Sequence, residues 1–287
     1  MNAVVFPTYT NSLKADALGE LACQALVHEV TLTPKPALVD SRNNGAHKDM
    51  NLEMMLASAN CLKPYFTQMA LAGSKADSFQ LLRNIIGEIG REAEAAMLIT
   101  TGGVNTHKGA IWALGLLVTT LGMEVESEVE LFQTAALLAK LTDQSIPSCA
   151  PVTNGQKVLS KYGVKGAREE ATLGFPTIVN AGLPALRLSR EMGDAEEICQ
   201  LNALLLIMSN LNDTCVLSRA GLSGLNAMQH GAAQVLALGG AGTPSGSEAL
   251  KKLDKKLLSL KASAGGAADL LAATLLVDSY WNDTSQL

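Results

Sequence analysis

A ten-residue stretch places several chemically active side chains directly before an apolar run. Residues 101–110 carry Asn105, Thr106, His107 and Lys108 between two pairs of small residues, and residues 111–118 are apolar throughout. A helix in that run would be buried on every face. We expect Thr106 or Asn105 to cap it, and its first turn to offer unpaired backbone N–H groups that suit an anion. A loop that only caps a core helix fits this stretch equally well.

A second segment, residues 29–49, is unusually dense in ionisable groups. Glu29 continues the apolar stripe of a predicted helix, and a carboxylate on an inward face needs a partner. A helix end that emerges into solvent is the alternative. Pro34 and Pro36 stiffen the loop that follows, and rigid loops often carry functional sites. We favour a site over a solvated loop. The polar residues of this loop are Lys35, Asp40, Arg42, Asn43, Asn44, His47, Lys48 and Asp49.

Three later stretches combine charge with glycine or with the end of an apolar helix. Arg168 and Glu169 lie in the first, Asp213 and Arg219 in the second, and Asp269 follows two glycines in the third. Polar groups at the end of a buried helix are costly unless they are paired or bind something. An exposed Arg–Glu helix face is the alternative for the first stretch. We expect these three stretches to meet residues 29–49 and 101–108 in one cavity.

The pattern of apolar residues predicts an all-α fold, a single compact multi-helix domain in which loops and helix ends form the site around buried central helices. Helical spacing of apolar residues recurs along the chain, and no alternating strand pattern appears. We expect about ten to thirteen helices at typical helix lengths. Residues 1–13 are expected to form an N-terminal tail, and residues 14–287 the catalytic domain. The main helices are expected over residues 14–30, 49–72, 77–100, up to 122, 126–141, up to 191 and from 194. Asp49 is expected to cap the second helix, and Asp77 or Ser78 to start the third. The third helix is expected to face inward with Leu81, Leu82, Ile85, Ile86 and Ile89. Residues 143–154 and 239–246 are expected to be a turn-rich excursion and a linker.

The composition bounds the class of protein. The chain has 287 residues, 48% of them hydrophobic and 17% charged, and a net charge of −5. With no basic block, nucleic acid is not an expected partner. No secretory leader and no membrane-spanning run are expected. The five scattered cysteines favour reduced thiols in the cytoplasm. So apolar a chain is compatible with self-association into a homo-oligomer.

The clusters described above, taken together, resemble the triphosphoribosyl-dephospho-CoA synthase family over about residues 14–280. The resemblance lies in residues 29–36, 38–40, 45–50, 103–109, 166–171, 174–176, 212–214, 218–219 and 265–271. The family usually has glycine at the position of Ala37, Gly-Gly at Ala220 and Gly221, and Ser-Pro at Ser263 and Ala264. These departures change the backbone and remove no charged group.

The resemblance implies a reaction in which ATP and 3′-dephospho-CoA give 2′-(5″-triphosphoribosyl)-3′-dephospho-CoA and adenine. The product is the prosthetic-group precursor of citrate lyase or malonate decarboxylase. Breaking a bond at an anomeric carbon builds positive charge on the ribose, which a carboxylate stabilises, and another group accepts the proton of the attacking hydroxyl. A nucleotide-binding helical protein without turnover, and an N-glycosidic hydrolase, are the alternatives.

The same resemblance assigns roles to the clustered residues. The expected catalytic residues are Glu29, Asp49, Glu169, Asp213 and Asp269. The expected substrate-binding residues are Lys35, His47, Lys48, Asn105, Thr106, His107, Lys108, Arg168 and Arg219. Mg²⁺ is expected to accompany ATP, with Asp40, Asp49 and Asp213 as the predicted metal contacts. The two histidines are expected to hydrogen-bond a phosphate or the base, and a purely structural role for them is nearly as compatible with the sequence.

Overall fold

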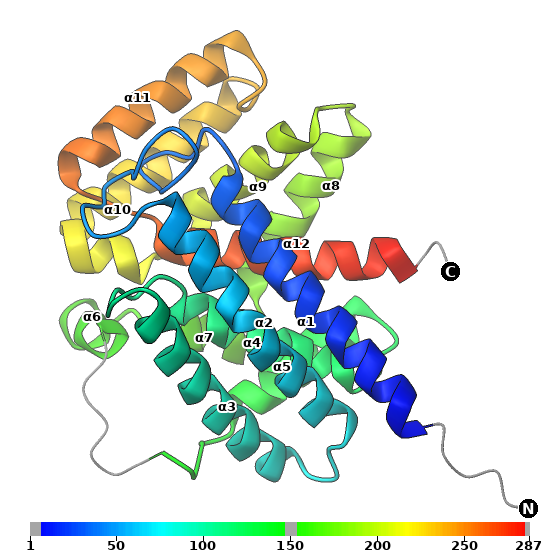
Figure 1. Cartoon of the computed structure of the whole chain (residues 1–287). Helices are drawn as coiled ribbons and strands as arrows, with labels where there is room; N and C mark the ends of the chain where they lie inside the picture. The colour runs from blue at the N-terminus through cyan, green and yellow to red at the C-terminus, as the bar shows by residue number, and fades with distance from the viewer. Residues whose placement is uncertain (1–6, 147–153, 285–287) are drawn as a thin grey trace, which may run out of the picture.

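The chain folds into an all-α domain, as the sequence predicts (Figure 1). The computed structural model describes residues 7–146 and 154–284. Within those residues every regular element is a helix: twelve α-helices and one short π-helical segment.

The helices follow one another through short connections. The first part of the chain contains α1 (Pro7–Thr31), α2 (Leu52–Ser74), α3 (Phe79–Thr100), α4 (Lys108–Gly122) and α5 (Glu128–Lys140). The second part contains α6 (Asn154–Tyr162), α7 (Ala167–Thr172), η1 (Ile178–Gly182), α8 (Leu183–Glu191), α9 (Glu196–Asn210), α10 (Thr214–Ala237), α11 (Pro244–Leu260) and α12 (Gly265–Thr284).

The centre of the domain is built around α4, α9 and α12. Twelve of the fifteen residues of α4 are buried, which confirms the prediction of a helix that is apolar all round. The helix α1 packs along α2 and against α12, and α2 packs on α4. Figure 1 shows α1 and α2 side by side, with α12 crossing behind them. The charged end of α1 and the start of α4 are therefore held by the same core.

Several helix ends differ from the predicted ones. The first helix begins at Pro7 and not at Lys14. Asp49 does not cap the second helix, because Asn51 does so by accepting a hydrogen bond from the backbone N–H of Met54 at 2.8 Å. Ser78 caps α3 as expected. These ends are decided by which side chain reaches the free N–H groups, a choice that spacing alone leaves open.

The outer face of α3 is more exposed than its apolar residues suggest. Leu82 and Ile86 are buried as predicted, but Leu81 and Ile85 are 58% and 39% exposed. The latter two line a groove of about 310 Å³ between α2 and α3. The prediction that all of them face inward was wrong, because the apolar stripe of α3 is wider than the surface that α2 and α4 cover.

The predicted linker and the predicted excursion are loops over most of the residues that the structure describes, but α11 begins at Pro244 and α6 at Asn154, inside the predicted bounds. Residues 238–243 form turns that lead into α11, and residues 141–146 form a turn after α5. The rest of the excursion, residues 147–153, lies outside the described residues. No helix in the described part is both long and apolar enough to cross a membrane.

Candidate functional site

Three helices begin close to the C-terminal end of α1. The carboxylate of Asp213, at the start of α10, accepts a hydrogen bond from the backbone N–H of Ala267 in α12 at 2.9 Å. Asp269 of α12 lies against Gly109 in α4, where an added Cβ would come within 2.0 Å of its carboxylate oxygen. Glycine at position 109 therefore leaves room for Asp269, and the starts of α4, α10 and α12 meet at one place.

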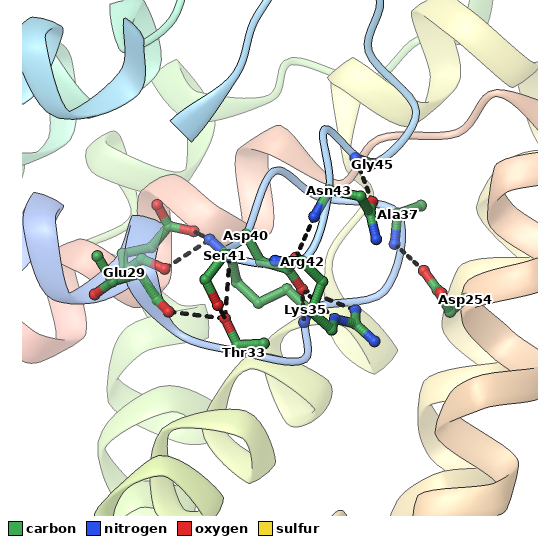
Figure 2. Close-up of polar contacts among 11 residues, drawn as sticks. Glu29, Thr33, Lys35, Ala37, Asp40, Ser41, Arg42, Asn43, Gly45 and Asp254 are labelled. Atoms are coloured by element: carbon green, nitrogen blue, oxygen red, sulfur yellow. Dashed lines mark hydrogen bonds and ion pairs between the residues drawn. The ribbon is translucent and has the colours of Figure 1, made fainter. Parts of the chain in front are cut away.

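The end of α1 contributes a buried ion pair to this place (Figure 2). The ammonium group of Lys35 lies 2.5 Å from the carboxylate of Glu29 and donates to the carbonyl oxygen of Glu29 at 2.6 Å. Both side chains are at most 4% exposed. The loop after Pro34 turns back over the helix end, so the lysine reaches a carboxylate six residues earlier. The pairing supplies the partner that the sequence predicts for Glu29.

Asp40 organises the loop that carries Lys35. Its carboxylate accepts hydrogen bonds from the backbone N–H groups of Lys35, Arg42 and Asn43 at 3.0, 2.8 and 3.2 Å. The guanidinium group of Arg42 adds two more, at 2.9 and 2.8 Å. In Figure 2 this carboxylate lies inside the fold of the loop. Asp40 thus holds Lys35 in position, and its oxygen atoms are engaged by groups of the protein itself.

Ala37 takes a backbone conformation that favours glycine. Its φ angle is +56° and its side chain is fully buried. Its N–H donates to Asp254 of α11 at 2.8 Å, and its carbonyl accepts from Ala46 at 2.9 Å. A left-handed alanine costs on the order of 1 kcal/mol relative to an unstrained one. The family that the chain resembles usually has glycine at this position, and glycine would avoid that strain. In this protein the loop keeps its geometry despite the strain at Ala37.

His107 presents a ring nitrogen with no partner. It is 2% exposed, and its Nδ1 atom hydrogen-bonds the hydroxyl of Ser58 at 2.8 Å. Among the described residues, nothing hydrogen-bonds its Nε2 atom. Burial, and then the positive charge of Lys35, lower the pKa of His107 to about 4. The imidazole is therefore neutral at pH 7, and its free nitrogen is the kind of buried polar atom that calls for a ligand.

Two aspartates of the cluster keep their protons more tightly than usual. Burial raises the pKa of Asp269 well above its ordinary value, and the negative charges of Glu29 and Asp213 raise it further. The pKa of Asp213 is also raised by burial, although backbone N–H groups of α10 and α12 partly offset this. Three carboxyl groups thus share one region with a single buried lysine, an arrangement typical of acid–base chemistry.

The rim of the cluster is formed by His47 and its neighbours. The Nε2 atom of His47 lies 2.7 Å from the hydroxyl of Ser263, just before α12. Its Nδ1 atom lies 3.1 Å from Arg219 of α10 and 3.4 Å from Asp49. Burial, and then Arg219, lower the pKa of His47. The side chains of Lys48, Asp49 and Arg219 are exposed. This rim ties the loop to α10 and leaves cations in contact with solvent.

The first turn of α4 is less open to an anion than the sequence predicts. Asn105 accepts a hydrogen bond from the N–H of Lys108 at 3.2 Å, and the N–H of Ala110 stabilises the carboxylate of Asp269. The ammonium group of Lys108 pairs with Glu94 of α3 at 2.5 Å. Thr106 does not cap the helix and hydrogen-bonds Ser58 at 2.6 Å. Two of the donors expected to be free are therefore taken by side chains of the protein.

The structure gathers most of the predicted residues and leaves others at a distance. Glu29, Lys35, His107, Asp213 and Asp269 form the buried cluster, with the rim around His47 beside it. Glu169 pairs with Lys165 on the exposed side of α7, and the charge of Arg168 acts on Arg83 of α3.

Sequence reasoning missed Ser58, Ser263 and Arg83. The only signal for Ser58 and Arg83 was a polar residue inside an otherwise apolar helix stripe, and such a residue is more often an exposed edge. The sequence marks Ser263 only as part of a departure from the backbone pattern of the family, and nothing in it points to the contact with His47.

The three predicted metal contacts do not form a metal centre. Asp40 and Asp213 direct their oxygen atoms to N–H donors of the protein. Asp49 is exposed and faces His47. Within residues 7–146 and 154–284, no three His, Cys, Asp or Glu side chains are grouped as metal ligands would be. We therefore derive no step through a metal ion held by these side chains.

In this all-helical domain, buried carboxyl groups, a buried lysine and a neutral histidine meet beneath exposed cations. The arrangement defines a candidate site for proton transfer on an anionic substrate. Residues 15–285 match the model of the ATP:dephospho-CoA triphosphoribosyl transferase family. The chain belongs to this family of transferase enzymes, as the motifs predicted.

Named members of this family are similar to the chain along nearly their whole length. A protein of Pseudomonas fluorescens (strain Pf0-1), named a probable 2-(5″-triphosphoribosyl)-3′-dephosphocoenzyme-A synthase, is 53% identical over 272 residues, which cover 94% of this chain and 93% of that protein. A Klebsiella pneumoniae protein named 2-(5″-triphosphoribosyl)-3′-dephosphocoenzyme-A synthase is 50% identical over 264 residues, or 91% and 93% of the two chains. No solved structure matches the chain significantly.

Proposed function

We propose that this protein transfers the 5″-triphosphoribosyl group of ATP to the 2′-hydroxyl of 3′-dephospho-CoA and releases adenine. Membership of the transferase family supports the proposal. The observation that carries it at the level of the site is the cluster of Glu29, Lys35, His107 and Asp269, because the reaction needs both a proton donor and a proton acceptor beside an anomeric carbon.

The reaction breaks the bond between the anomeric carbon and N9 of adenine and forms a bond from that carbon to the hydroxyl oxygen. The hydroxyl loses a proton and the departing adenine gains one. Asp269 suits the donor role, because its raised pKa keeps it protonated to a higher pH than an ordinary aspartate. Once ionised, it also opposes the positive charge that builds on the ribose.

Glu29 suits the acceptor role. Its carboxylate is held by the ammonium of Lys35, and its negative charge is felt at Asp269. A proton taken from the hydroxyl by Glu29 and returned to Asp269 after adenine leaves would restore the starting state. The unpartnered Nε2 atom of His107 would orient one of the substrates by a hydrogen bond. The nucleophile in this scheme is the 2′-hydroxyl of 3′-dephospho-CoA.

The substrates carry five phosphates between them into a protein of net charge −5. Lys48 and Arg219 are the predicted cations that the rim leaves exposed. Mg²⁺ stays a prediction, as the counter-ion of the triphosphate. A cytoplasmic location, where both nucleotides are made, also stays a prediction. So does a homo-oligomer, which light scattering of the purified protein measures. We further propose that the product serves the acyl carrier protein of citrate lyase or of malonate decarboxylase.

Mass analysis of the products tests the function. The protein is incubated with ATP, Mg²⁺ and 3′-dephospho-CoA, and in parallel without 3′-dephospho-CoA. We expect adenine and the triphosphoribosylated product in equal amounts in the first mixture only. Adenine with free triphosphoribose in the second mixture would identify a hydrolase. No adenine in either mixture, from a protein that binds both nucleotides, would leave a binding protein without turnover.

A further inference from the structure

Arg83 of α3 is a buried cation with an unsatisfied donor. The residue is 8% exposed, and its guanidinium group lies 5.3 Å from the centre of the Trp112 ring of α4. Its closest carboxylate, that of Asp143, is 3.7 Å away. The Nε atom is buried and no group among the described residues accepts its hydrogen bond. A buried guanidinium with a free donor is costly unless something else compensates it.

The charges of two more arginines act on Arg83. Arg91 of α3 donates to Asp143 at 2.7 Å. Arg168 of α7 has no acidic partner among the described residues. Burial lowers the pKa of Arg83, the carboxylate of Asp143 raises it, and the positive charges of Arg168 and Arg91 lower it. The guanidinium groups of Arg83 and Arg91 therefore share the carboxylate of Asp143, and that of Arg168 adds a third positive charge that acts on Arg83. The two unmatched positive charges stand in a protein whose overall charge is negative, so they attract an anion to this place in particular.

This place adjoins the buried cluster. Trp112 lies one helical turn beyond Lys108 on α4, about 6 Å along the axis at 1.5 Å per residue. The indole N–H of Trp112 donates to the carbonyl of Ala167 at 3.2 Å, which fixes α7, and with it Arg168, against α4. A substrate that reaches Asp269 at the first turn of α4 can thus extend its phosphates toward these arginines.

We propose that Arg83, Arg91 and Arg168 form, around Trp112, a subsite that binds the polyphosphate chain of one of the two nucleotide substrates. The assignment of that ligand rests on the proposed function. Arg168 and Arg91 are the exposed members and make the contacts to phosphate oxygens, which guanidinium groups bind in pairs. Arg83 lies beneath them and adds its charge. The source of the polyphosphate is either the triphosphate of ATP or the diphosphate of 3′-dephospho-CoA.

Binding measured for each nucleotide separately distinguishes the two sources. Isothermal titration calorimetry is run with ATP and with 3′-dephospho-CoA on the wild-type protein and on Arg168→Ala. We expect the Kd of one nucleotide to rise at least tenfold and that of the other to stay within twofold. Arg168→Lys should recover part of the loss. Lys255→Ala, an exposed α11 residue with no ion pair in the described structure, should leave both Kd values unchanged.

A second variant and a second signal distinguish loss of the subsite from a merely structural effect of the substitution. Arg91→Ala should weaken the same nucleotide as Arg168→Ala, and the fluorescence of Trp112, assigned with Trp112→Phe, should change when that nucleotide binds. If both arginine variants bind both nucleotides as the wild type does, the subsite is overturned. If one nucleotide loses affinity in the variants while the wild type releases no adenine, the subsite stands and the proposed function fails.

Discussion

Replacing Asp213 by alanine should destabilise the protein through two helices at once. One oxygen of the carboxylate accepts hydrogen bonds from the N–H groups of Cys215 and Val216 at 2.7 and 3.1 Å, and the other from Ala267 at 2.9 Å. It therefore caps α10 and fastens the start of α12 to it. The substitution removes the cap and leaves the N–H of Ala267 buried without an acceptor.

The size of the effect follows from these contacts. Loss of an N-cap costs about 1 kcal/mol, and an unpaired buried N–H costs about 1–3 kcal/mol. Burial of the carboxyl group is itself unfavourable, so removing the group offsets part of this cost. We therefore expect the free energy of unfolding to fall by about 2–3 kcal/mol. Unfolding 287 residues at about 2.1 cal/mol/K per residue carries an entropy of about 0.6 kcal/mol/K, so the Tm should fall by about 3–5 °C.

Calorimetry of Asp213→Ala and of a single-cap control measures this loss. Ser127 caps α5 alone, by accepting from the N–H of Glu130 at 3.2 Å. Ser127→Ala should lower the Tm by about 2 °C, since only one cap is lost. If the two variants lose the same Tm while Asp213→Ala alone is inactive per folded molecule, Asp213 acts in the chemistry and the clamp argument is refuted.

The remaining predictions concern the buried cluster. Lys35→Met should destabilise the protein by about 3–5 kcal/mol, because it leaves the carboxylate of Glu29 buried and unpaired. The double variant Lys35→Met with Glu29→Gln should recover most of the Tm and none of the turnover. A double variant as unstable as Lys35→Met alone would contradict this expectation. The pKa of His107 lies near 4 in the folded protein and near 6.5 in the unfolded chain, so its contribution to stability is present above pH 6.5 and is lost between 6.5 and 4. That loss is roughly 3 kcal/mol. His107→Asn should therefore reduce the fall of the Tm over this pH range. An identical fall in the wild type and the variant would mean that the imidazole of the native protein carries a proton. The raised pKa of Asp269 means that its contribution to stability is present below about pH 4 and is lost as the pH rises through its folded pKa. Asp269→Asn should therefore raise the Tm relative to the wild type more at pH 8 than at pH 5, while adenine release is lost, and a gain that does not depend on pH would remove the basis for its role as an acid.

Much of the candidate site was predictable because its residues stand at helix ends. The stripe that includes Leu18 and Leu26 placed Glu29 inward, and Glu29 is indeed 3% exposed. The spacing could not say that its partner would be Lys35, since a loop can fold back in many ways. Only the turn built on Asp40 brings that ammonium group to the end of α1.

Other residues looked alike in the sequence and differ in the fold. Asp49 and Asp269 are both acidic residues near a predicted helix start, yet Asp49 is exposed and Asp269 is buried against Gly109. The pairing of a side-chain acceptor with a backbone donor depends on how closely two helices approach each other. The sequence pattern does not contain that distance. For the same reason Arg83 gave no signal, because a stripe of helical period does not show which of its edges a neighbour will cover.

The order of apolar and polar residues by itself determined the all-helical class, the buried character of α4 and the family, since those depend on periodicity and on motifs that lie within short segments. The tertiary structure alone decided that Glu29, His107, Asp213 and Asp269 share one region, and that Arg219 lies at His47 while Arg83 lies at Trp112. Pairing, burial and the resulting pKa shifts arise between segments up to 240 residues apart, as with Glu29 and Asp269, and only packing sets those distances.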